Sequence, residues 1–529
     1  MRKLRLPPRS RPRGDSGRTL DRTKSTGFTP RPSTRDDAAE AGAAQEGFAR
    51  SLRNVLWMSS SSVLTRILNL ARGVILARLL TPFDFGVYGL GVSIVGVKER
   101  LSDIGTGSFL VYRPKEIEDH ADTTFWVNLA LSSFLLALLA AFAPLLGRLY
   151  REPLLVPVLV LLGLGVWARL NASVHQSLLR TGGRFRAVAV IDNCASAAWL
   201  AIAVILAWKG FGVWALVASA VAANVILAAL LIVTQGWRPQ WKISRDSLRL
   251  LGGFSFWFLG QGIAWYAATN LDNWMVGRYL GMGALGIYAI AYNYSLLPVT
   301  LVGNAMGNVG FAEMPKLYDR PERFWASYRD FSRVLALLGC FASFAAIVAA
   351  PDVIPLVLGA KWEPAVVPFQ ILSVYAATRC LWMDPFLALG NFRLSCLTGI
   401  VAVTIVAISV GIGLRFGLVG VACAMLGTQI AYQIASLLLV SRSWRRLANA
   451  ARTSLPYLAG GAIAASIGIG VRHFEPSGAP GVRIAAVVVA LGAFTCVYGL
   501  MFCGDLKATL RLLRDKQPKS DEHAGRGNG

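Results

Sequence analysis

The 529-residue sequence is poor in charged residues, and acidic residues are the scarcer kind. Charged residues make up 16% of the chain, with 29 acidic against 53 basic residues, whereas 55% are hydrophobic. The mean hydropathy of +0.52 lies far above that of a soluble globular domain. These proportions exclude an ordinary soluble enzyme or binding domain, and they predict an all-α integral membrane protein that crosses the bilayer many times.

The groups that catalysis and metal binding require are scarce. The chain has four histidines, no cluster of aspartates within its apolar part, and no G-x-x-x-x-G-K-[ST] loop for ATP. The predicted outward connections, such as "GRLYREP" and "WKGFG", are too short to hold an acceptor substrate. We therefore expect no enzyme activity, no cofactor and no metal site, which counts against a membrane-embedded glycan polymerase or ligase.

The cysteines give no sign of a disulfide framework. The seven are odd in number, show no C-x-x-C spacing, and lie in or at the ends of apolar segments. They are interpreted as small core residues.

The net charge of +24 raises the question of nucleic acid. A nucleic-acid binder needs a solvated basic face, whereas here the basic residues flank apolar runs, so we expect no nucleic-acid partner. Residues 1–52 are basic and almost free of aromatics, which predicts a disordered cytoplasmic tail. No signal-peptide pattern precedes the first apolar helix, and that helix is expected to direct insertion.

Apolar runs of about 20 residues predict about fourteen transmembrane helices. The predicted spans are 54–76, 84–106, 123–147, 153–176, 186–208, 211–235, 250–272, 283–309, 331–350, 362–388, 393–414, 417–440, 454–471 and 482–503. With the N-terminus inside, the cytoplasmic tails and loops carry 40 lysines and arginines and the outward loops carry 9. This bias predicts that both termini are cytoplasmic.

Two stretches repeat one outline at a constant offset of 200: "VILARLLTPFDFGVYGL" (74–90) and "WMVGRYLGMGALGIYAI" (274–290). The matched pairs are Arg78 with Arg278, Leu80 with Leu280, Gly86 with Gly286, and Tyr88 with Tyr288. Both stretches join the first and second helices of a predicted set of six. A parallel duplication of this kind places two similar bundles around an axis along the membrane normal, as in alternating-access transporters, although it does not by itself exclude a channel or an anchor.

Several phrases carry a family resemblance, among them "LARLLTPFDFGVYGL", "LLRTGGRFRAVAVID", "NLDNWMVGRYLGMGALGIYAIAYN" and "VLGAKWEPAV". Together they resemble the polysaccharide flippases of the MOP superfamily, the Wzx-type O-antigen and exopolysaccharide translocases, which are relatives of the lipid II flippase and the MATE exporters. The resemblance covers roughly residues 52–440. It implies two pseudo-symmetric six-helix lobes followed by two further helices. The predicted division is an N-lobe at 53–235, a C-lobe at 236–440, helices 13 and 14 at 441–503, and a cytoplasmic tail at 504–529.

The resemblance implies a flippase that moves polyprenyl-pyrophosphate-linked oligosaccharide repeat units across the bacterial inner membrane for surface or extracellular polysaccharide, including lipopolysaccharide. Its expected partners are this lipid-linked oligosaccharide, membrane lipids, and the polysaccharide polymerase and export machinery. The alternative is a MATE-like, ion-coupled exporter of small molecules. Drug cavities for cationic substrates favour acids over arginines, which places this alternative second.

An anionic pyrophosphate that crosses hydrocarbon needs buried cations, and arginines within predicted helices meet that need. We name Arg72, Arg66 and Arg379 as candidate substrate-binding residues. The lipid II flippase has a similar arginine pair with the same six-residue gap in its first helix. Arg66 could instead extend its head to the membrane surface. Arg379 could pair with Asp384, five residues further on.

The repeated arginines Arg78 and Arg278 lie at the outward ends of their predicted helices. We expect them to pin the turn that follows, while Gly86 and Gly286 permit close helix packing. These four residues are therefore predicted to be structural residues of the turn in each lobe.

Membrane carboxylates are the candidates for gating or for coupling to H⁺ or Na⁺, namely Asp272, Asp192 and Asp384. The offset of 200 also matches Arg72 with Asp272, so equivalent positions carry opposite charges. One hypothesis is that these two residues pair in one state and separate in the other. The alternative is that Asp272 orients its own helix end beside Asn270 and Asn273.

Aromatic residues near the lobe junction could stack on sugar rings, although packing is the default interpretation. They are Trp257, Trp265, Tyr266, Tyr292 and Tyr294.

Overall fold

The computed structural model describes residues 61, 63–102, 117–241, 244, 256–297, 299–300, 321–381, 392–441, 444–473 and 480–505. Helices account for nearly all of these residues, and no strand occurs among them. The predicted all-α class is confirmed. The tail at 1–52 and the carboxylate Asp384 lie outside the described residues, as does the tail at 504–529 apart from its first two residues.

The turn after the first helix follows from its local sequence. The first helix covers residues 63–79, and α2 begins at Pro82 (Pro82–Ser102). Thr81 precedes α2, and its hydroxyl accepts a hydrogen bond from the Asp84 amide at 3.3 Å. The Asp84 carboxylate in turn accepts one from the Thr81 amide at 2.9 Å. This reciprocal cap, with proline at the first helical position, ends one helix and starts the next.

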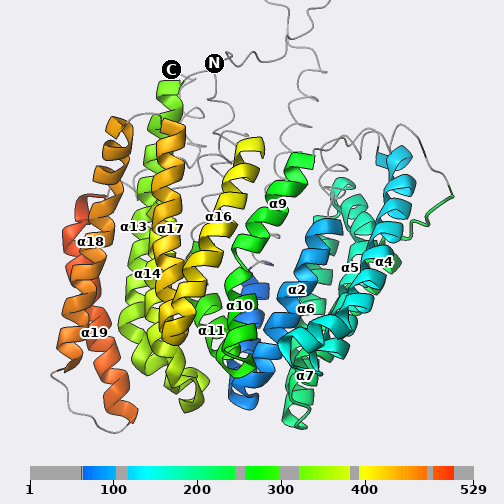
Figure 1. The fold of residues 1–529 in the computed structure, drawn as a ribbon, viewed down its shortest axis with the longest axis horizontal. Coiled ribbons are helices and arrows are strands. Elements are labelled where there is room, and N and C mark those ends of the chain that lie inside the picture. The colour runs from blue at the N-terminus through cyan, green and yellow to red at the C-terminus, as the bar shows by residue number, and fades with distance from the viewer. Residues whose placement is uncertain are drawn as a thin grey trace, which may run out of the picture. The chain divides into compact units, whose positions relative to one another are not determined.

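Four long helices complete the first half of the chain. They are α4 (Ile117–Tyr150), α5 (Leu155–Thr181), α6 (Phe185–Trp208) and α7 (Val213–Gln235). Helix α5 packs between α4 and α7, and α7 also packs on α6 (Figure 1). Small residues lie at these contacts, as at Gly163, where an added Cβ would meet the side chains of Leu139 and Leu136 within 3.0 Å. Close approach of this kind supplies the van der Waals contact that holds helices together in a bilayer.

The predicted span 250–272 is divided in the structure. Helix α9 (Phe256–Ala268) ends, and α10 (Leu271–Tyr279) begins after a two-residue turn. The Thr269 hydroxyl donates to the Trp265 carbonyl at 3.0 Å, and the Asn270 amide donates to the Tyr266 carbonyl at 3.0 Å. Such side-chain bonds offer the backbone an alternative to continuing the helix.

The second half continues with a series of helices and three short irregular turns. They are α11 (Met282–Ser295), α13 (Pro321–Val353), the π-helical turn η3 (Ile354–Leu358), the 3-10 turn η4 (Ala360–Ala365), α14 (Val366–Leu381), α16 (Phe392–Gly413), the 3-10 turn η5 (Leu414–Phe416) and α17 (Gly417–Ser441). Helix α14 packs against both α13 and α17, whereas α16 packs against α9 and α17.

The last two described helices are α18 (Trp444–His473) and α19 (Pro480–Met501). They pack on each other and on α13 through buried aromatic and aliphatic side chains (Figure 1). At one end of this contact, the Arg333 guanidinium donates to the Tyr457 hydroxyl at 2.9 Å, and that hydroxyl donates to the Asp505 carboxylate at 2.6 Å. This bridge joins α13 to α18 and to the residues after α19.

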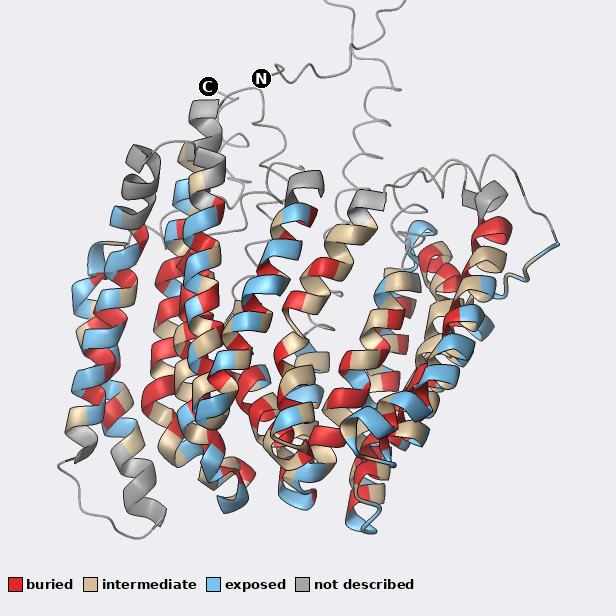
Figure 2. Cartoon of the chain, in the orientation of Figure 1, coloured by how far each residue is buried: buried red, intermediate tan, exposed pale blue. Residues whose placement is uncertain are grey.

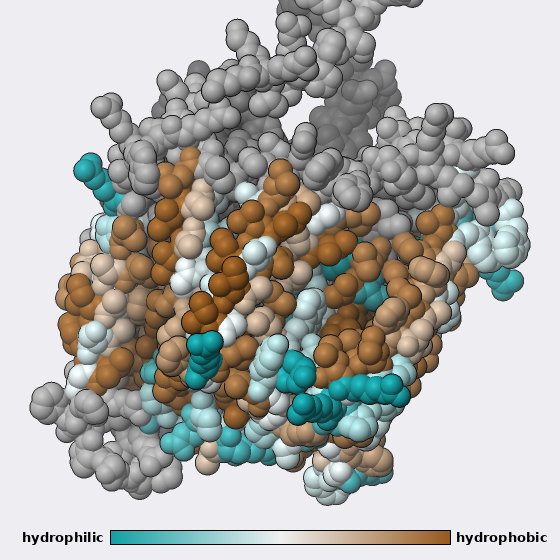
Figure 3. Space-filling model, in the orientation of Figure 1, coloured by the Kyte–Doolittle hydropathy of each residue, from teal (hydrophilic) through white to brown (hydrophobic). Residues whose placement is uncertain are grey.

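The outer faces of the helices are apolar. Large hydrophobic side chains such as Phe134 (64% exposed), Ile408 (61%) and Val488 (64%) project outward, while buried residues face the helix contacts (Figure 2). Apolar residues cover most of the described helix surface in Figure 3, and hydrophilic residues gather near one end. This is the distribution that a lipid environment imposes. The chain is a multi-pass membrane protein.

Six described segments are long and apolar enough to cross a bilayer by length and composition. They are Ala121–Tyr150, Leu155–Thr181, Phe185–Trp208, Val213–Gln235, Ala326–Leu358 and Cys396–Ser436. The total of about fourteen and the division into lobes stay predictions.

Candidate functional site

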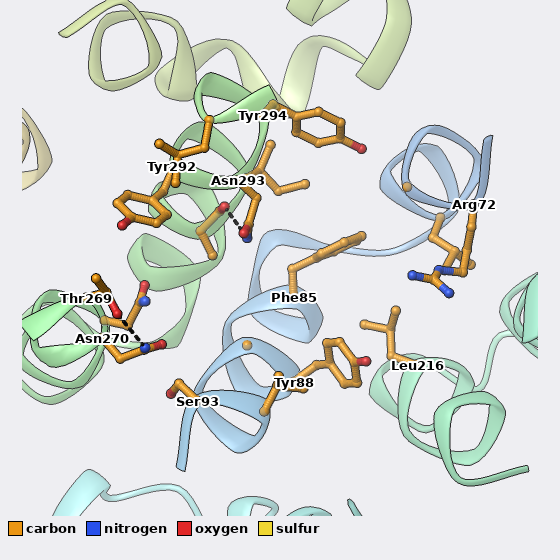
Figure 4. A pocket seen from close by; sticks show the side chains of 18 of the residues that line it. Arg72, Phe85, Tyr88, Ser93, Leu216, Thr269, Asn270, Tyr292, Asn293 and Tyr294 are labelled. Carbon is orange, nitrogen blue, oxygen red and sulfur yellow. Dashed lines mark hydrogen bonds between the residues drawn. The ribbon is translucent and has the colours of Figure 1, made fainter. Parts of the chain in front are cut away.

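A cavity of about 550 Å³ lies between helices of the first and second halves of the chain (Figure 4). Its lining comes from the helix at 63–79 and from α2, α6 and α7 on one side, and from α9, α10, α11 and α14 on the other. The volume falls in the range of small-ligand sites. Two of the three predicted substrate-binding arginines, Arg72 and Arg379, line this cavity.

Arg72 presents an unneutralised cation to the cavity. Its guanidinium carbon lies 3.4 Å from the centroid of the Trp199 ring, a cation–π contact that positions the planar group. Its Nη1 atom is buried and has no hydrogen-bond partner among the described residues. Because a buried donor without a partner costs about 1 to 3 kcal/mol, the site is suited to receive an acceptor from a ligand.

Arg379 projects from α14 on the other side of the cavity. Its Nη1 atom lies 3.4 Å from the Tyr375 hydroxyl, and its guanidinium carbon lies 6.0 Å from the centroid of the Trp265 ring. These contacts are long, so among the described residues the guanidinium keeps donors for a ligand. The predicted local partner, Asp384, lies outside the described residues.

Asp272 is fully buried in the first turn of α10 and accepts a hydrogen bond from the Tyr288 hydroxyl of α11 at 2.7 Å. Its other carboxylate oxygen has no partner among the described residues. Arg72 contacts Trp199 instead, so the structure holds the two residues in the separated arrangement. The hypothesis that they pair in another state stays a prediction.

The remaining candidate residues lie away from the cavity. Arg66 is half-buried on the first helix, and Asp192 is half-buried on α6. Neither belongs to the described lining of the cavity. Their roles as a substrate ligand and a coupling carboxylate stay predictions.

Sequence analysis missed a row of amides on the second-half side of the cavity. Asn270, Asn273 and Asn293 line it together with Thr269. Asn270 and Asn273 are three residues apart, a spacing that brings side chains to one face of a helix. That spacing was the available signal, and the two asparagines were considered only as neighbours of Asp272 at the helix end. Of the predicted aromatics, Tyr266, Tyr292 and Tyr294 also line the cavity, whereas the side chain of Trp257 is not described.

A contact between two segments far apart in the sequence closes the predicted outward end. The Arg78 guanidinium donates to the carbonyls of Leu356 and, at 2.8 Å, of Val357 in η3. In return, the Lys361 ammonium donates to the Arg78 carbonyl at 2.8 Å and to the Leu80 carbonyl at 2.6 Å. Arg78 was expected to pin its own turn, which stays a prediction, and its guanidinium bonds a segment about 280 residues away.

Trp362 completes this closure. Its side chain is fully buried, its indole N–H donates to the Ala77 carbonyl at 2.8 Å, and its ring meets Phe85 edge to face at 5.3 Å. Desolvation lowers the pKa of the neighbouring Lys361 ammonium, and the nearby Asp84 carboxylate acts in the opposite direction. We call Arg78, Lys361 and Trp362 the outward latch.

The two repeated glycines lie at the contact between α2 and α11. A Cβ on Gly86 would lie 1.8 Å from the Met282 carbonyl oxygen, and one on Gly286 would lie 1.7 Å from the Pro82 carbonyl oxygen. Both obstacles are backbone atoms, so no rotamer change can relieve them. Only glycine permits these helices to approach so closely.

Comparison with known proteins finds a matching family and several relatives. A family model described as "Polysaccharide biosynthesis protein" matches residues 75–367. The succinoglycan biosynthesis transport protein ExoT of Rhizobium meliloti (strain 1021) is 27% identical over 337 residues, which cover 63% of this chain and 68% of the relative. The lipopolysaccharide biosynthesis protein WzxC of Escherichia coli (strain K12) is 23% identical over 336 residues, covering 62% and 68%.

Two solved structures share the fold. The lipid II flippase MurJ, in an inward closed conformation, superposes with a TM-score of 0.67 at 13% identity, covering 85% of this chain and all of that chain. An inward-facing multidrug resistance MATE transporter of the MOP superfamily gives a TM-score of 0.54 at 16% identity, covering 74% and 96%. The predicted likeness in fold to the lipid II flippase and the MATE exporters is confirmed. Since the family model matches more than half of its residues, the chain belongs to the polysaccharide biosynthesis protein family.

Proposed function

We propose that the protein is a flippase that moves polyprenyl-pyrophosphate-linked oligosaccharide repeat units from the cytoplasmic to the outer face of the bacterial inner membrane. The single observation that carries this proposal is the unneutralised Arg72 guanidinium in a cavity between the two halves of the chain. The pyrophosphate supplies the acceptor oxygens that this group lacks, and arginine binds phosphate oxygens with two parallel hydrogen bonds.

Transport on this proposal follows alternating access between two six-helix lobes, N-lobe 53–235 and C-lobe 236–440, in a chain of about fourteen helices. The outward latch and the close contact of α2 with α11 hold the outward end shut, so the structure corresponds to a state that loads from the cytoplasm. The lipid-linked head group enters between the lobes, and Arg72 and Arg379 neutralise the pyrophosphate. Opening of the latch then releases it outward.

A MATE-like exporter of cationic compounds is the alternative, and the fold fits it equally well. The described lining of the cavity counts against it, because it holds two arginines and no carboxylate. A cationic drug would find repulsion there instead of a counter-ion. An anionic head group is the better match.

The energy source on this proposal is an H⁺ or Na⁺ gradient, the membrane potential, or removal of the product by the polymerase and export machinery. Of the described coupling candidates, Asp272 adjoins the cavity, because its neighbour Asn273 belongs to the lining. A buried carboxylate held by one tyrosine can take up a proton or a cation. Transport measurements in proteoliposomes with imposed H⁺ or Na⁺ gradients would test ion coupling. Identical transport with and without both gradients would exclude it.

The decisive experiment removes the gene and extracts the membrane lipids. We expect polyprenyl-pyrophosphate oligosaccharide to accumulate in the cytoplasmic leaflet while the surface polymer is lost. Complementation with the wild-type chain should restore polymer, and complementation with Arg72→Gln should restore little. Unchanged surface polymer without accumulation of lipid-linked sugar would refute the flippase proposal.

The orientation is proposed from the distribution of basic residues, with both termini in the cytoplasm. Reporter fusions test it at six positions. Fusions at Gly210, Lys361 and Ser477 should report the outside, and fusions at Gly183, Arg320 and Arg446 should report the inside. One reversed internal position would mean that a pair of predicted spans was miscounted.

A further inference from the structure

The two walls of the cavity differ in chemistry. The first-half wall carries Arg72 among apolar side chains such as Leu76, Phe85 and Leu216. The second-half wall carries uncharged polar side chains from the α9–α10 turn, α10 and α11, together with Arg379 of α14, and Figure 4 shows Thr269 and Asn270 on the side opposite Arg72. A ligand that fits both walls therefore has one anionic part and one uncharged polar part.

Two side-chain amides of the second-half wall, those of Asn270 and Asn293, already donate hydrogen bonds to backbone carbonyls. The Asn270 side-chain amide donates to the Tyr266 carbonyl at 3.0 Å, and the Asn293 side-chain amide donates to the Ala289 carbonyl at 2.8 Å. Both bonds run to the carbonyl four residues earlier in the same helical segment. The side-chain carbonyl oxygens of these residues remain as acceptors.

Asn273 gives the most direct evidence that this wall receives a hydrogen-bond donor from a ligand. Its Oδ1 atom is buried and has no hydrogen-bond partner among the described residues. The Thr269 hydroxyl donates to the Trp265 carbonyl at 3.0 Å, and its oxygen accepts a hydrogen bond from the Asn270 amide at 3.4 Å. The buried Oδ1 atom of Asn273 is therefore the acceptor that favours a ligand with a donor.

Hydroxyl and acetamido N–H groups of sugars are uncharged donors, so a glycan matches this wall. Pyrophosphate oxygens are acceptors, so they match the Arg379 guanidinium and not the unpartnered Oδ1 atom of Asn273, and a hydrocarbon tail matches neither group. The Asp272 carboxylate does not belong to the described lining, and one of its oxygens accepts a hydrogen bond from Tyr288. The tyrosines Tyr266 and Tyr292 in the same lining add aromatic faces on which sugar rings can pack.

We propose that Asn270, Asn273 and Asn293 form a glycan-recognition wall that reads the first sugars of the lipid-linked substrate, while Arg72 on the opposite wall holds the pyrophosphate. This inference rests on the proposed function. It assigns specificity for the sugar to the asparagines of the second half of the chain, and affinity for the carrier pyrophosphate to Arg72 together with Arg379.

The test measures binding of two probes to the purified full-length protein in lipid nanodiscs. One probe is a bare polyprenyl diphosphate, and the other is the lipid-linked oligosaccharide extracted from the deletion strain. The wild type should bind the glycosylated probe about tenfold more tightly. The double variant N270L/N273L should reduce this preference toward one and leave the bare probe within about twofold, because each lost hydrogen bond lowers affinity about two- to tenfold.

Two further variants separate the alternatives. R72Q should weaken binding of both probes alike. N171L is the matched control, because Asn171 makes the same amide bond to a carbonyl four residues earlier, at 2.8 Å to Trp167, and lies on α5 away from the cavity lining. It should change the affinity for neither probe. If the double variant fails to fold, N293L at an exposed position carries the test.

The outcomes are distinguishable. An unchanged preference for the glycosylated probe in N270L/N273L, or in N293L when that variant carries the test, overturns the glycan-recognition wall. Sodium binding that the wild type shows and the asparagine variants lose, with the sugar preference intact, also overturns it and assigns the wall to a cation. Absence of binding of either probe to the wild type refutes the proposed function itself.

Discussion

The turn at 77–86 and its repeat at 277–286 begin from similar sequences and end in different surroundings. Their glycines behave alike, because Gly86 meets the Met282 carbonyl and Gly286 meets the Pro82 carbonyl, and these partners are themselves 200 residues apart. Helix packing at the α2–α11 contact is thus two-fold symmetric. The surrounding side chains differ, which shows that duplication preserved the packing and altered the contacts around it.

The helix starts illustrate the difference. Thr81 and Asp84 cap α2 through reciprocal hydrogen bonds, whereas α11 begins after Gly281, which has a φ of +88°. The arginines differ as well. Arg78 reaches the carbonyls of η3, while the Arg278 guanidinium lies 5.8 Å from the ring of its neighbour Tyr279. One copy thus carries the outward latch, and the other supplies a local contact.

The largest effect is expected from a substitution at the symmetric glycine contact between α2 and α11. Gly86→Ala places a methyl group 1.8 Å from a backbone oxygen, and overpacking that no rotamer relieves costs about 3 kcal/mol or more. We expect loss of surface polymer and a rise of about tenfold or more in labelling of a cysteine introduced at the cavity position Val92 by an impermeant maleimide. Gly286→Ala should behave alike.

Gly427→Ala is the control for the glycine substitutions, since no atom lies within 4 Å of a Cβ at that position on α17. It should leave both readouts unchanged. Normal polymer in Gly86→Ala would show that α2 and α11 need not meet during transport.

The next largest effect is on binding of polyprenyl diphosphate, and it distinguishes position 72 from position 272. Arg72→Gln should weaken binding of polyprenyl diphosphate about ten- to a hundredfold, because a charge-assisted hydrogen bond contributes about 1.5 to 3 kcal/mol. Asp272→Asn retains an acceptor for Tyr288 and should change this binding about twofold or less. Equal losses in both variants would contradict the assignment of phosphate binding to Arg72.

The pairing hypothesis requires a separate experiment. The variants Arg72→Ala and Asp272→Ala, their combination, and the exchange of the two residues would be compared for expression and surface polymer. If the residues pair in another state, the double variant should lose less than the sum of the single losses. Strictly additive losses with normal expression would exclude pairing.

A smaller effect is expected at the latch. Trp362→Phe keeps an aromatic ring beside Phe85 and removes the donor to the Ala77 carbonyl, which should cost about 1 to 2 kcal/mol. The population open to the outside should rise about five- to thirtyfold, measured by maleimide labelling at Val92. Trp208→Phe, at a side chain 80% exposed, is the matched control and should show no change.

The smallest effect separates the two repeated arginines. Arg78→Ala removes two hydrogen bonds at an exposed position and should favour outward opening by about 1 kcal/mol. Arg278→Ala should shift the same labelling by less than about twofold. Equal shifts would mean that the second copy of the turn also takes part in closure.

Much of the fold could be predicted because it depends on local patterns. The predicted spans 186–208 and 211–235 agree with α6 and α7 to within two residues at each end. The span 250–272 was wrong as a continuous helix, because hydropathy does not register the bonds by which Thr269 and Asn270 end α9. Periodicity finds apolar segments, and it misses a break made by individual polar side chains.

Within the site, the membrane location drew attention to Arg72 and Arg379, which both line the cavity. Arg66 and Asp192 satisfied the same sequence criterion, and the structure places them away from it. A charged residue in a span predicts a polar environment, without saying which interior it faces. The amides escaped prediction because uncharged polar residues are ordinary at helix ends.

By itself, the sequence determined that the chain belongs in a membrane, that its halves are related by a repeat, and that its cations outnumber its acids. Each of these follows from composition or from a pattern along one dimension. Only the tertiary structure decided that Arg72 faces a cavity while its counterpart Asp272 is held by Tyr288, and that Trp362 reaches the carbonyl of Ala77. Contacts between segments hundreds of residues apart depend on how whole helices pack, and that packing is set by the summed shapes of many side chains.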